Sequence, residues 1–325
     1  MGEKVSATIV IPTFHPGHDL TVLLHRLSCQ TVLPSRILIV NTCEKPEDAL
    51  QVRTLIEQAT ARPDWCQIPV NLIQIPKEQF DHGGTRDMAA RMTYTDWIVF
   101  MTMDALPAHR SMLAKLLQPF EDPKVACVYA RQLPREDAGP VESYMRHFNY
   151  GDISRCKVLA NKEELGIKTF FCSNVCCAYR SDVYLQLGGF EKRVIFNEDM
   201  IFAGKAIQAG YGVYYQAGAR VVHSHNYSGK QQFRRYFDLG VSQEMHPEIF
   251  GDLSSEGEGM RLVMNTAKWL TAHGLIHLVP GMIWQSGCKY LGYRAGQKWR
   301  KLPGRLIRKC TSNPGYWEQQ PAEGE

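Results

Sequence analysis

The sequence predicts an α/β protein with a mostly parallel sheet flanked by helices. Five apolar runs alternate with stretches of helical periodicity in the first half of the chain. Runs that are apolar on both faces and separated by helices are typical of a parallel sheet covered on both sides. In composition, the 325-residue chain is 44% hydrophobic and 22% charged, as folded proteins usually are. We therefore expect one large domain with a further segment.

The apolar runs are the predicted strands of the first half. They consist largely of aliphatic residues and are bounded by polar or turn-forming residues, as buried strands are. The five runs are Ala7–Pro12, Arg36–Asn41, Val70–Ile75, Trp97–Thr102 and Val125–Ala130.

The stretches between and after these runs have the period of helices. In Asp19–Gln30, for example, four leucines share one face. Pro46 is tolerated because it falls in the first turn of its helix. The predicted helices are Asp19–Gln30, Pro46–Ala61, Thr85–Thr93, Met112–Gln118, Ser181–Leu187, Glu198–Gln208 and Gln231–Leu239.

The middle of the chain is less regular. Residues 124–167 combine prolines with several aromatic residues, and we expect a loop-and-helix insertion near the functional site. Three further strands are predicted after it: Phe170–Tyr179, Val213–Tyr215 and Arg220–His223.

Charge is distributed unevenly along the chain. Residues 259–317 contain ten basic residues and no Asp or Glu, whereas the rest of the chain has 27 basic and 33 acidic residues. We therefore divide the chain into a main domain, residues 1–245, and a basic, aromatic and helical extension, residues 246–325. Basic residues mixed with tryptophans and tyrosines suit a peripheral contact with an anionic membrane surface. The alternative is a helical appendage packed on the body or on a second subunit; nucleic acid fits the charge, but no nucleic-acid motif accompanies it.

The cysteines predict a reducing compartment. Ten of them are scattered along the chain, and the start of the sequence has no apolar signal segment. We expect a cytoplasmic protein with free thiols. Cys172, Cys176 and Cys177 lie close in sequence but form no CxxC pair, which favours small buried thiols over a metal site.

Polar residues follow three of the predicted strands. Thr13, Asn41 and Asp104 come after the first, second and fourth strands. In parallel sheets, ligands bind beyond the carboxyl ends of the strands. A carboxylate at such a position can hold Mg²⁺ or Mn²⁺ on phosphate oxygens, although turn chemistry explains Asp104 equally well.

Three other groups could contribute to a site. Glu198 and Asp199 open a predicted helix, where acids are favoured by the helix dipole, and one of them could face a pocket as a general base. The glycines before Arg86 could let backbone amides approach an anion. His223 and His225 follow a strand, and alternation along an extended chain would let only one of them join Asp104.

In their order along the chain, these segments resemble family 2 glycosyltransferases with the GT-A fold, a Rossmann-like mixed sheet. The opening TIVIPTFHPGHDL is similar to the family's first strand and helix, and VFMTMDALP to its acidic metal motif. NEDMIFAGKAIQAGY resembles the acceptor-side segment, and VVHSHNYS the late histidine motif. With FDHGGTRDMAA, the set looks most like bacterial rhamnosyltransferases that build O-antigen or cell-wall polysaccharide.

The resemblance implies a metal-dependent, inverting transfer of L-rhamnose from dTDP-L-rhamnose to a saccharide or polyprenyl-linked saccharide. Asp199 would be the general base, supported by Glu198. Asp104 would hold Mg²⁺ or Mn²⁺, with His223 as second ligand and His225 as the less favoured choice. The nucleotide would contact Thr13, Asn41 and Arg86.

Two departures from the family pattern keep other functions open. Thr102 stands at the first position of the usual Asp-x-Asp motif, and Asn41 replaces an acid that contacts the nucleobase. One alternative is a sugar-1-phosphate nucleotidyltransferase, although its glycine-rich loop follows the first strand. The other is a non-catalytic, membrane-docked scaffold. We expect the protein itself to lie in the cytoplasm, peripherally at the inner face of the cytoplasmic membrane.

Overall fold

A computed structural model describes residues 3–318, except 252 and 254–255. Its strands are β1 (Glu3–Phe14), β2 (Val32–Cys43), β3 (Val70–Pro76), β4 (Trp97–Met101), β5 (Leu106–Pro107), β6 (Val125–Leu133), β7 (Arg155–Lys157), β8 (Cys176–Arg180) and β9 (Gly212–Val222).

The helices of the main body surround this sheet. They are α1 (His18–Ser28), α2 (Pro46–Thr60), α3 (His82–Arg91), α4 (Met112–Leu117), α5 (Pro140–Asn149), α6 (Lys162–Leu165), α7 (Ser181–Gln186), α8 (Glu198–Gln208) and α9 (Gly229–Met245).

The C-terminal part is helical, as predicted. Its helices are α10 (Pro247–Phe250), α11 (Glu256–Ala272), α12 (Val279–Gly296), α13 (Gly304–Cys310) and α14 (Pro314–Glu318). Short 3-10 turns occupy Lys77–Gln79, Gln118–Glu121, Leu159–Asn161, Gly166–Phe170, Ile276–Leu278 and Trp299–Lys301.

All nine strands belong to one sheet, in the order β3-β2-β1-β4-β8-β6-β9-β5, with β7 paired to β9. Strands β1 to β4 are parallel where they pair, and β8 runs antiparallel between β4 and β6. Strand β9 is parallel to β6, so six strands point the same way. The prediction of a mixed, mostly parallel α/β sheet is therefore confirmed.

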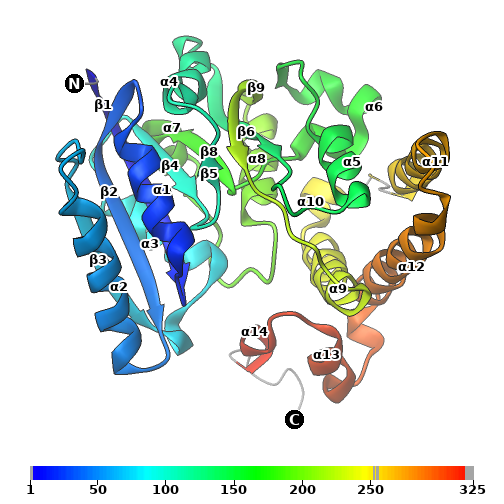
Figure 1. Cartoon of the computed structure of the whole chain (residues 1–325). Coiled ribbons are helices and arrows are strands. Elements are labelled where there is room, and N and C mark those ends of the chain that lie inside the picture. Colours follow the sequence, from blue (N-terminus) through cyan, green and yellow to red (C-terminus); the bar gives the residue numbers. More distant parts are fainter. Residues whose placement is uncertain (1–2, 252, 254–255, 319–325) are drawn as a thin grey trace.

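Helices cover both faces of the sheet (Figure 1). One apolar core joins the sheet to α1, α2 and α4, and includes the fully buried Leu20 and Leu24. The other joins it to α3, α7 and α8, and includes Phe100 and Phe202. Burial on both faces explains why the first four strands read as continuous apolar runs.

Two strand predictions differ from the structure. Val213–Tyr215 and Arg220–Val222 are parts of the single strand β9, because a register shift against β6 at Ala130/Arg131 carries the pairing past residues 217–219, while His223 lies just beyond the strand. Phe170–Tyr179 is a strand only from Cys176, since its first residue ends a 3-10 turn.

Helix α12 lies along α9, α13 and α14 lie below it, and α11 lies farther out, beyond α12 (Figure 1). Helix α12 packs closely on α9: a Cβ atom at Gly292 would lie 2.2 Å from the Phe233 carbonyl oxygen, and one at Gly296 would lie 2.1 Å from that of Phe237. Within the described residues, no helix combines the length and hydrophobicity needed to cross a bilayer.

Candidate active site

Three possible metal ligands converge beyond the carboxyl end of β4. Asp104 Oδ2 lies 3.2 Å from His225 Nε2 and 3.6 Å from His223 Nε2. The two Nε2 atoms are 3.1 Å apart, and all three ligand atoms lie within 4.8 Å of one another. A carboxylate and two imidazoles are a suitable set for a divalent cation.

The expectation that only one histidine could reach Asp104 was wrong. It assumed an extended chain, but β9 ends at Val222, and both histidines follow in an irregular segment. The two rings therefore meet edge to face, with centres 4.7 Å apart. His225 is the closer of the two to Asp104, although His223 was preferred on sequence.

A hydrogen bond fixes the proton of His223 on the far side of the ring. Its Nδ1 lies 3.1 Å from Gln132 Oε1, which also accepts a bond from Arg146 and so is the amide oxygen. Nδ1 therefore donates, and Nε2 turns its lone pair towards Asp104. Burial lowers the pKa of His223 to about 3, which keeps the ring neutral.

Asp104 is held as a carboxylate. Burial works against its ionisation, but the hydrogen bond to His225 and the nearby histidine ring outweigh burial and lower its pKa. A charged carboxylate beside a neutral His223 is the protonation state that metal ligation requires.

The acid pair lies at the start of α8, and its two members have different surroundings. Glu198 is buried, with Oε1 3.2 Å from Arg86 Nη1 and 3.1 Å from Asn174 Nδ2. Asp199 is partly exposed and accepts backbone hydrogen bonds of 2.8 Å from Asn174 and Met200. The structure therefore places Glu198, and not Asp199, in the buried ion pair.

The two acids also differ in protonation. Burial opposes the ionisation of Glu198, but the charge of Arg86 outweighs it and lowers its pKa. Burial and the charge of Glu198 both raise the pKa of Asp199. A carboxylate with a raised pKa beside a fixed negative charge is suited to accept a proton.

Hydrogen bonds lead from the metal-ligand cluster to the residue next to the one that binds the acid pair. Gln132, which accepts from His223, donates through Nε2 to Ser173 Oγ at 3.0 Å. The next residue in the chain, Asn174, bonds both acids. The backbone between Ser173 and Asn174 therefore links the surroundings of His223 to those of Asp199.

Thr13 and Asn41 meet at the ends of neighbouring parallel strands. Thr13 Oγ1 donates to Asn41 Oδ1 at 2.9 Å, and both residues are buried. Asn41 also donates to Cys43 Sγ at 3.2 Å. Thr13 and Asn41 therefore lie towards the carboxyl ends of β1 and β2, where ligands bind in parallel sheets. The metal-ligand cluster follows β4, which pairs with the other edge of β1.

The glycine loop before Arg86 serves packing. The Gly84 amide donates to Asp81 Oδ2, the N-cap of α3, at 2.6 Å. A Cβ atom at Gly83 would lie 2.0 Å from the Glu191 carbonyl oxygen. The Gly84 amide is therefore engaged within the protein, Gly83 is closely packed, and Arg86 faces Glu198.

Sequence reasoning missed Gln132, Asn174 and Arg235. Arg235, on α9, stacks between two rings, with Cζ 4.8 Å from the centre of Tyr227 and 5.3 Å from that of Phe196. Besides burial, its charge lowers the pKa of His223 on one side of the site and of His82 on the other. Its position about two helical turns after the end of the histidine motif was the available signal, whereas Asn174 gave none.

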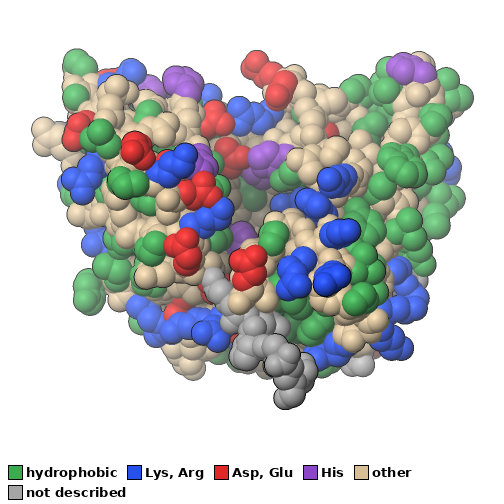
Figure 2. Space-filling view, turned by 90° about the horizontal axis from the view of Figure 1, so that it is seen from below, with side chains coloured by type: hydrophobic (Ala, Val, Ile, Leu, Met, Phe, Trp, Pro, Cys, Tyr) green, Lys and Arg blue, Asp and Glu red, His purple; other side chains and the backbone are tan. Residues whose placement is uncertain are grey.

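Some buried polar atoms of site residues, or of their neighbours in the chain, have no hydrogen-bond partner within the described residues. They are Thr42 Oγ1, Arg86 Nε and Asn197 Nδ2. Unpaired buried donors and acceptors are costly, so a polar ligand that paired with them would be stabilised. Figure 2 shows a recess in the face seen from below, with histidine and acidic side chains at its edge.

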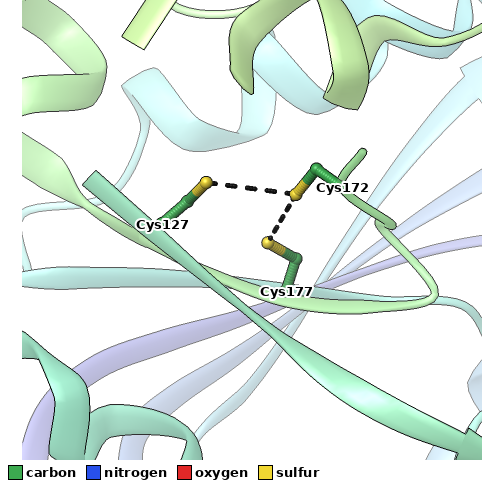
Figure 3. A group of neighbouring side chains, drawn as sticks. All are labelled: Cys127, Cys172 and Cys177. Carbon is green, nitrogen blue, oxygen red and sulfur yellow. Dashed lines mark hydrogen bonds between the residues drawn. The ribbon is translucent and has the colours of Figure 1, made fainter. Parts of the chain in front are cut away.

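The three cysteines predicted to be buried thiols, Cys172, Cys176 and Cys177, are buried, but Cys176 lies apart from the other two. Cys172 Sγ lies 3.4 Å from Cys177 Sγ and 3.9 Å from Cys127 Sγ (Figure 3). Cys176 points to the other face of the sheet, 3.9 Å from Met112 Sδ. Alternation along β8 separates it from its neighbour.

Comparisons with known proteins agree with this fold. The model of a family described as "Glycosyltransferase like family 2" matches residues 6–241. The chain is 36% identical to the O-antigen chain rhamnosyltransferase RfbN of Salmonella typhimurium, over 95% of both chains. It is also 36% identical to the O-antigen chain rhamnosyltransferase WbaN of Salmonella anatum, over 96% of both.

Solved structures show the same fold at low sequence identity. A mannosyltransferase from Pyrobaculum calidifontis, solved with GDP-Man and Mn²⁺, matches with a TM-score of 0.57 and 16% identity, covering 97% of this chain and 88% of that one. TarS from S. aureus matches with a TM-score of 0.50 and 12% identity, covering 91% of each. The fold is that of GT-A glycosyltransferases. The chain belongs to glycosyltransferase family 2, as its motifs predicted, and is a glycosyltransferase.

Proposed function

We propose that the chain transfers L-rhamnose from dTDP-L-rhamnose to a saccharide or polyprenyl-linked saccharide during O-antigen synthesis, with inversion at the anomeric carbon. The names of two relatives that match over nearly the whole chain support the sugar and the polymer. The proposal rests on the link from His223 through Gln132 and Ser173 to the neighbouring Asn174, which bonds Asp199, because the reaction needs a leaving-group site and a base near each other.

Asp104 and the two histidines fit a divalent metal. The carboxylate is charged, His223 presents a lone pair, and the buried Thr102 hydroxyl interacts with Asp104 and helps to lower its pKa. We propose that Asp104, His223 and His225 hold Mg²⁺ or Mn²⁺. When bound, the metal would stabilise the negative charge of the departing diphosphate.

Asp199 is the proposed general base, and Glu198 supports it. The Arg86 guanidinium holds Glu198 charged and in place, and that charge raises the proton affinity of Asp199. Asn174 orients both carboxyl groups. Asp199 would take the acceptor hydroxyl proton as the oxygen attacks the anomeric carbon.

For the nucleotide we propose Thr13 and Asn41, whose side chains lie at adjacent strand ends. Arg86 also belongs to the proposed nucleotide-sugar site. Because it is paired with Glu198, we propose that it acts by holding that carboxylate in place. Arg235 adds a cation between the two halves of the site. The nucleotidyltransferase alternative loses support because the glycines follow β3, in the first turn of α3, and the Gly84 amide donates to the N-cap side chain of Asp81.

A panel of nucleotide sugars tests the donor. Thermal unfolding would be measured with dTDP-L-rhamnose, UDP-glucose, GDP-mannose and dTDP alone, each with Mn²⁺, Mg²⁺ or EDTA. We expect dTDP-L-rhamnose with metal to stabilise the protein most, because a ligand bound only to the folded state raises its stability. The Asp104→Ala variant should lose the metal-dependent part. Equal shifts with every sugar, or an unchanged shift in Asp104→Ala, would contradict the proposal.

We also propose that the protein works in the cytoplasm, peripherally at the inner face of the cytoplasmic membrane. A lipid-linked acceptor would be found there, and the acid-free basic run of residues 259–317 supports contact with anionic lipid.

A further inference from the structure

Helix α12 exposes an apolar stripe to solvent. Ile283, Trp284, Tyr290 and Leu291 are 54%, 70%, 52% and 61% exposed, and Ile276 in the preceding turn is 63% exposed. The other three helical residues come one, seven and eight positions after Ile283, which places all four side chains on one side of α12. We call these five residues the α12 stripe.

The opposite side of α12 is fixed against the protein. Gly292 and Gly296 lie so close to α9 that a Cβ atom would overlap backbone oxygens there. Met282 is buried with Leu270 and Met145. The α12 stripe is therefore held facing outward by close packing.

The charges around the stripe identify its partner. Residues 259–317 contain no acid, and exposed cations follow the stripe along the chain. A second copy of this chain would bring the same positive charge, which opposes association through this surface. An anionic phospholipid bilayer complements both the apolar and the basic part. The exposed cations are Lys298, Lys301, Arg305, Arg308 and Lys309.

The stripe also lies close to the active site. A Cβ atom at Gly229, the first residue of α9, would be 2.9 Å from Trp284 Nε1. Gly229 comes four residues after His225, in the segment that carries the metal-ligand cluster. Figure 2 shows hydrophobic side chains gathered on the α11–α12 side of the face that contains the recess.

We propose that the α12 stripe inserts into the interfacial layer of an anionic phospholipid bilayer, with the following cations on its headgroups. This deepens the proposed membrane position by naming the surface, and it depends on neither the donor nor the metal. Docked in this way, the protein would hold the segment from His225 to Gly229 near the bilayer, where a lipid-linked acceptor could reach the site.

Vesicle flotation of the full chain tests the proposal. The vesicles would be phosphatidylcholine alone or with one-third phosphatidylglycerol. We expect binding to the mixed vesicles, and a loss of about tenfold or more in the partition coefficient for the triple variant Ile283→Ser, Trp284→Ser, Leu291→Ser. The matched control is Leu50→Ser with Tyr94→Ser, which removes side chains 67% and 97% exposed elsewhere and should leave binding unchanged.

A charge variant and two further readouts complete the test. Lys298→Glu with Lys301→Glu and Arg305→Glu should weaken binding to phosphatidylglycerol vesicles, as should added salt. Wild-type partitioning of the triple variant, or equal binding to both vesicle types, would overturn the proposal. The proposal would also be overturned if sedimentation showed a dimer of the wild type that is lost in the triple variant. Donor hydrolysis without lipid should be unaffected in every variant; its absence from the wild type would count against the proposed function alone.

Discussion

Two adjacent acids of α8 have opposite electrostatic roles because their partners differ. Glu198 is paired with a buried guanidinium, whereas Asp199 meets only backbone amides. Breaking a buried pair leaves a charge without compensation, so Glu198 and Arg86 depend on each other. Their pairing leaves Asp199 as the acid that can exchange a proton.

The Glu198→Gln variant tests this division of roles. Removing the negative charge beside Asp199, with Arg86 still present, should lower the Asp199 pKa. A base is active when deprotonated, so the acidic limb of the pH profile of kcat/KM should move to lower pH. The measurement is sugar transfer from about pH 4 to pH 9.

A matched substitution controls for the effect of removing any one carboxylate from the protein. Glu191→Gln changes a carboxylate that pairs with Lys205 and His246. It should leave the acidic limb in place. An unmoved limb in Glu198→Gln, or one moved to higher pH, would contradict the electrostatic role of Glu198.

Strand ends and charged motifs made part of the site predictable from sequence. Asp104 and Asn41 follow apolar runs, and that position alone marks ligand sites in parallel sheets. Asn174 was not predictable, because it gains its role only when the irregular segment before β8 meets α8. The approach of both histidines to Asp104 likewise depends on where β9 ends.

At the scale of elements, the contact of α9 with α12 requires glycine. The Phe233 and Phe237 carbonyl oxygens of α9 occupy the space of the missing Cβ atoms at Gly292 and Gly296. Such close approach fixes α12, and therefore its exposed stripe, relative to the active-site segment before α9. The sequence predicted helices here, but the pairing joins residues about sixty positions apart, which periodicity does not reveal.

Alanine substitutions on α12 test this contact. Gly292→Ala should destabilise the protein by about 1–3 kcal/mol, because the new methyl group would force the backbones apart. Gly287→Ala on the same helix has nothing within 4 Å and should stabilise by up to about 1 kcal/mol. Urea unfolding would measure both. Equal effects would show that the helices do not pack as described.

At the scale of the whole molecule, the C-terminal extension completes the core around α9. Asp238 on α9 accepts hydrogen bonds from Thr311 Oγ1 at 2.6 Å and the Ser312 amide at 2.8 Å. Glu244 accepts one from Trp299 Nε1 at 2.7 Å. The boundary after residue 245 remains a prediction from composition, and these contacts favour a single cooperative unit.

Calorimetry tests that cooperativity. We expect one unfolding transition for the full chain, and a markedly lower Tm for residues 1–245, which would leave Asp238 and the glycine contacts of α9 uncovered. Two separate transitions in the full chain, or a shortened chain with unchanged Tm, would instead support an independent main domain.

The rate of sugar transfer by Asp199→Asn tests the central claim most directly. With dTDP-L-rhamnose, Mn²⁺ and a lipid-linked saccharide acceptor, single-turnover transfer should fall about 10²–10⁴-fold. The Kd for the donor should stay unchanged by calorimetry, because Asp104 and the histidines are intact. A near-normal transfer rate in Asp199→Asn would remove Asp199 from catalysis and contradict the proposed mechanism.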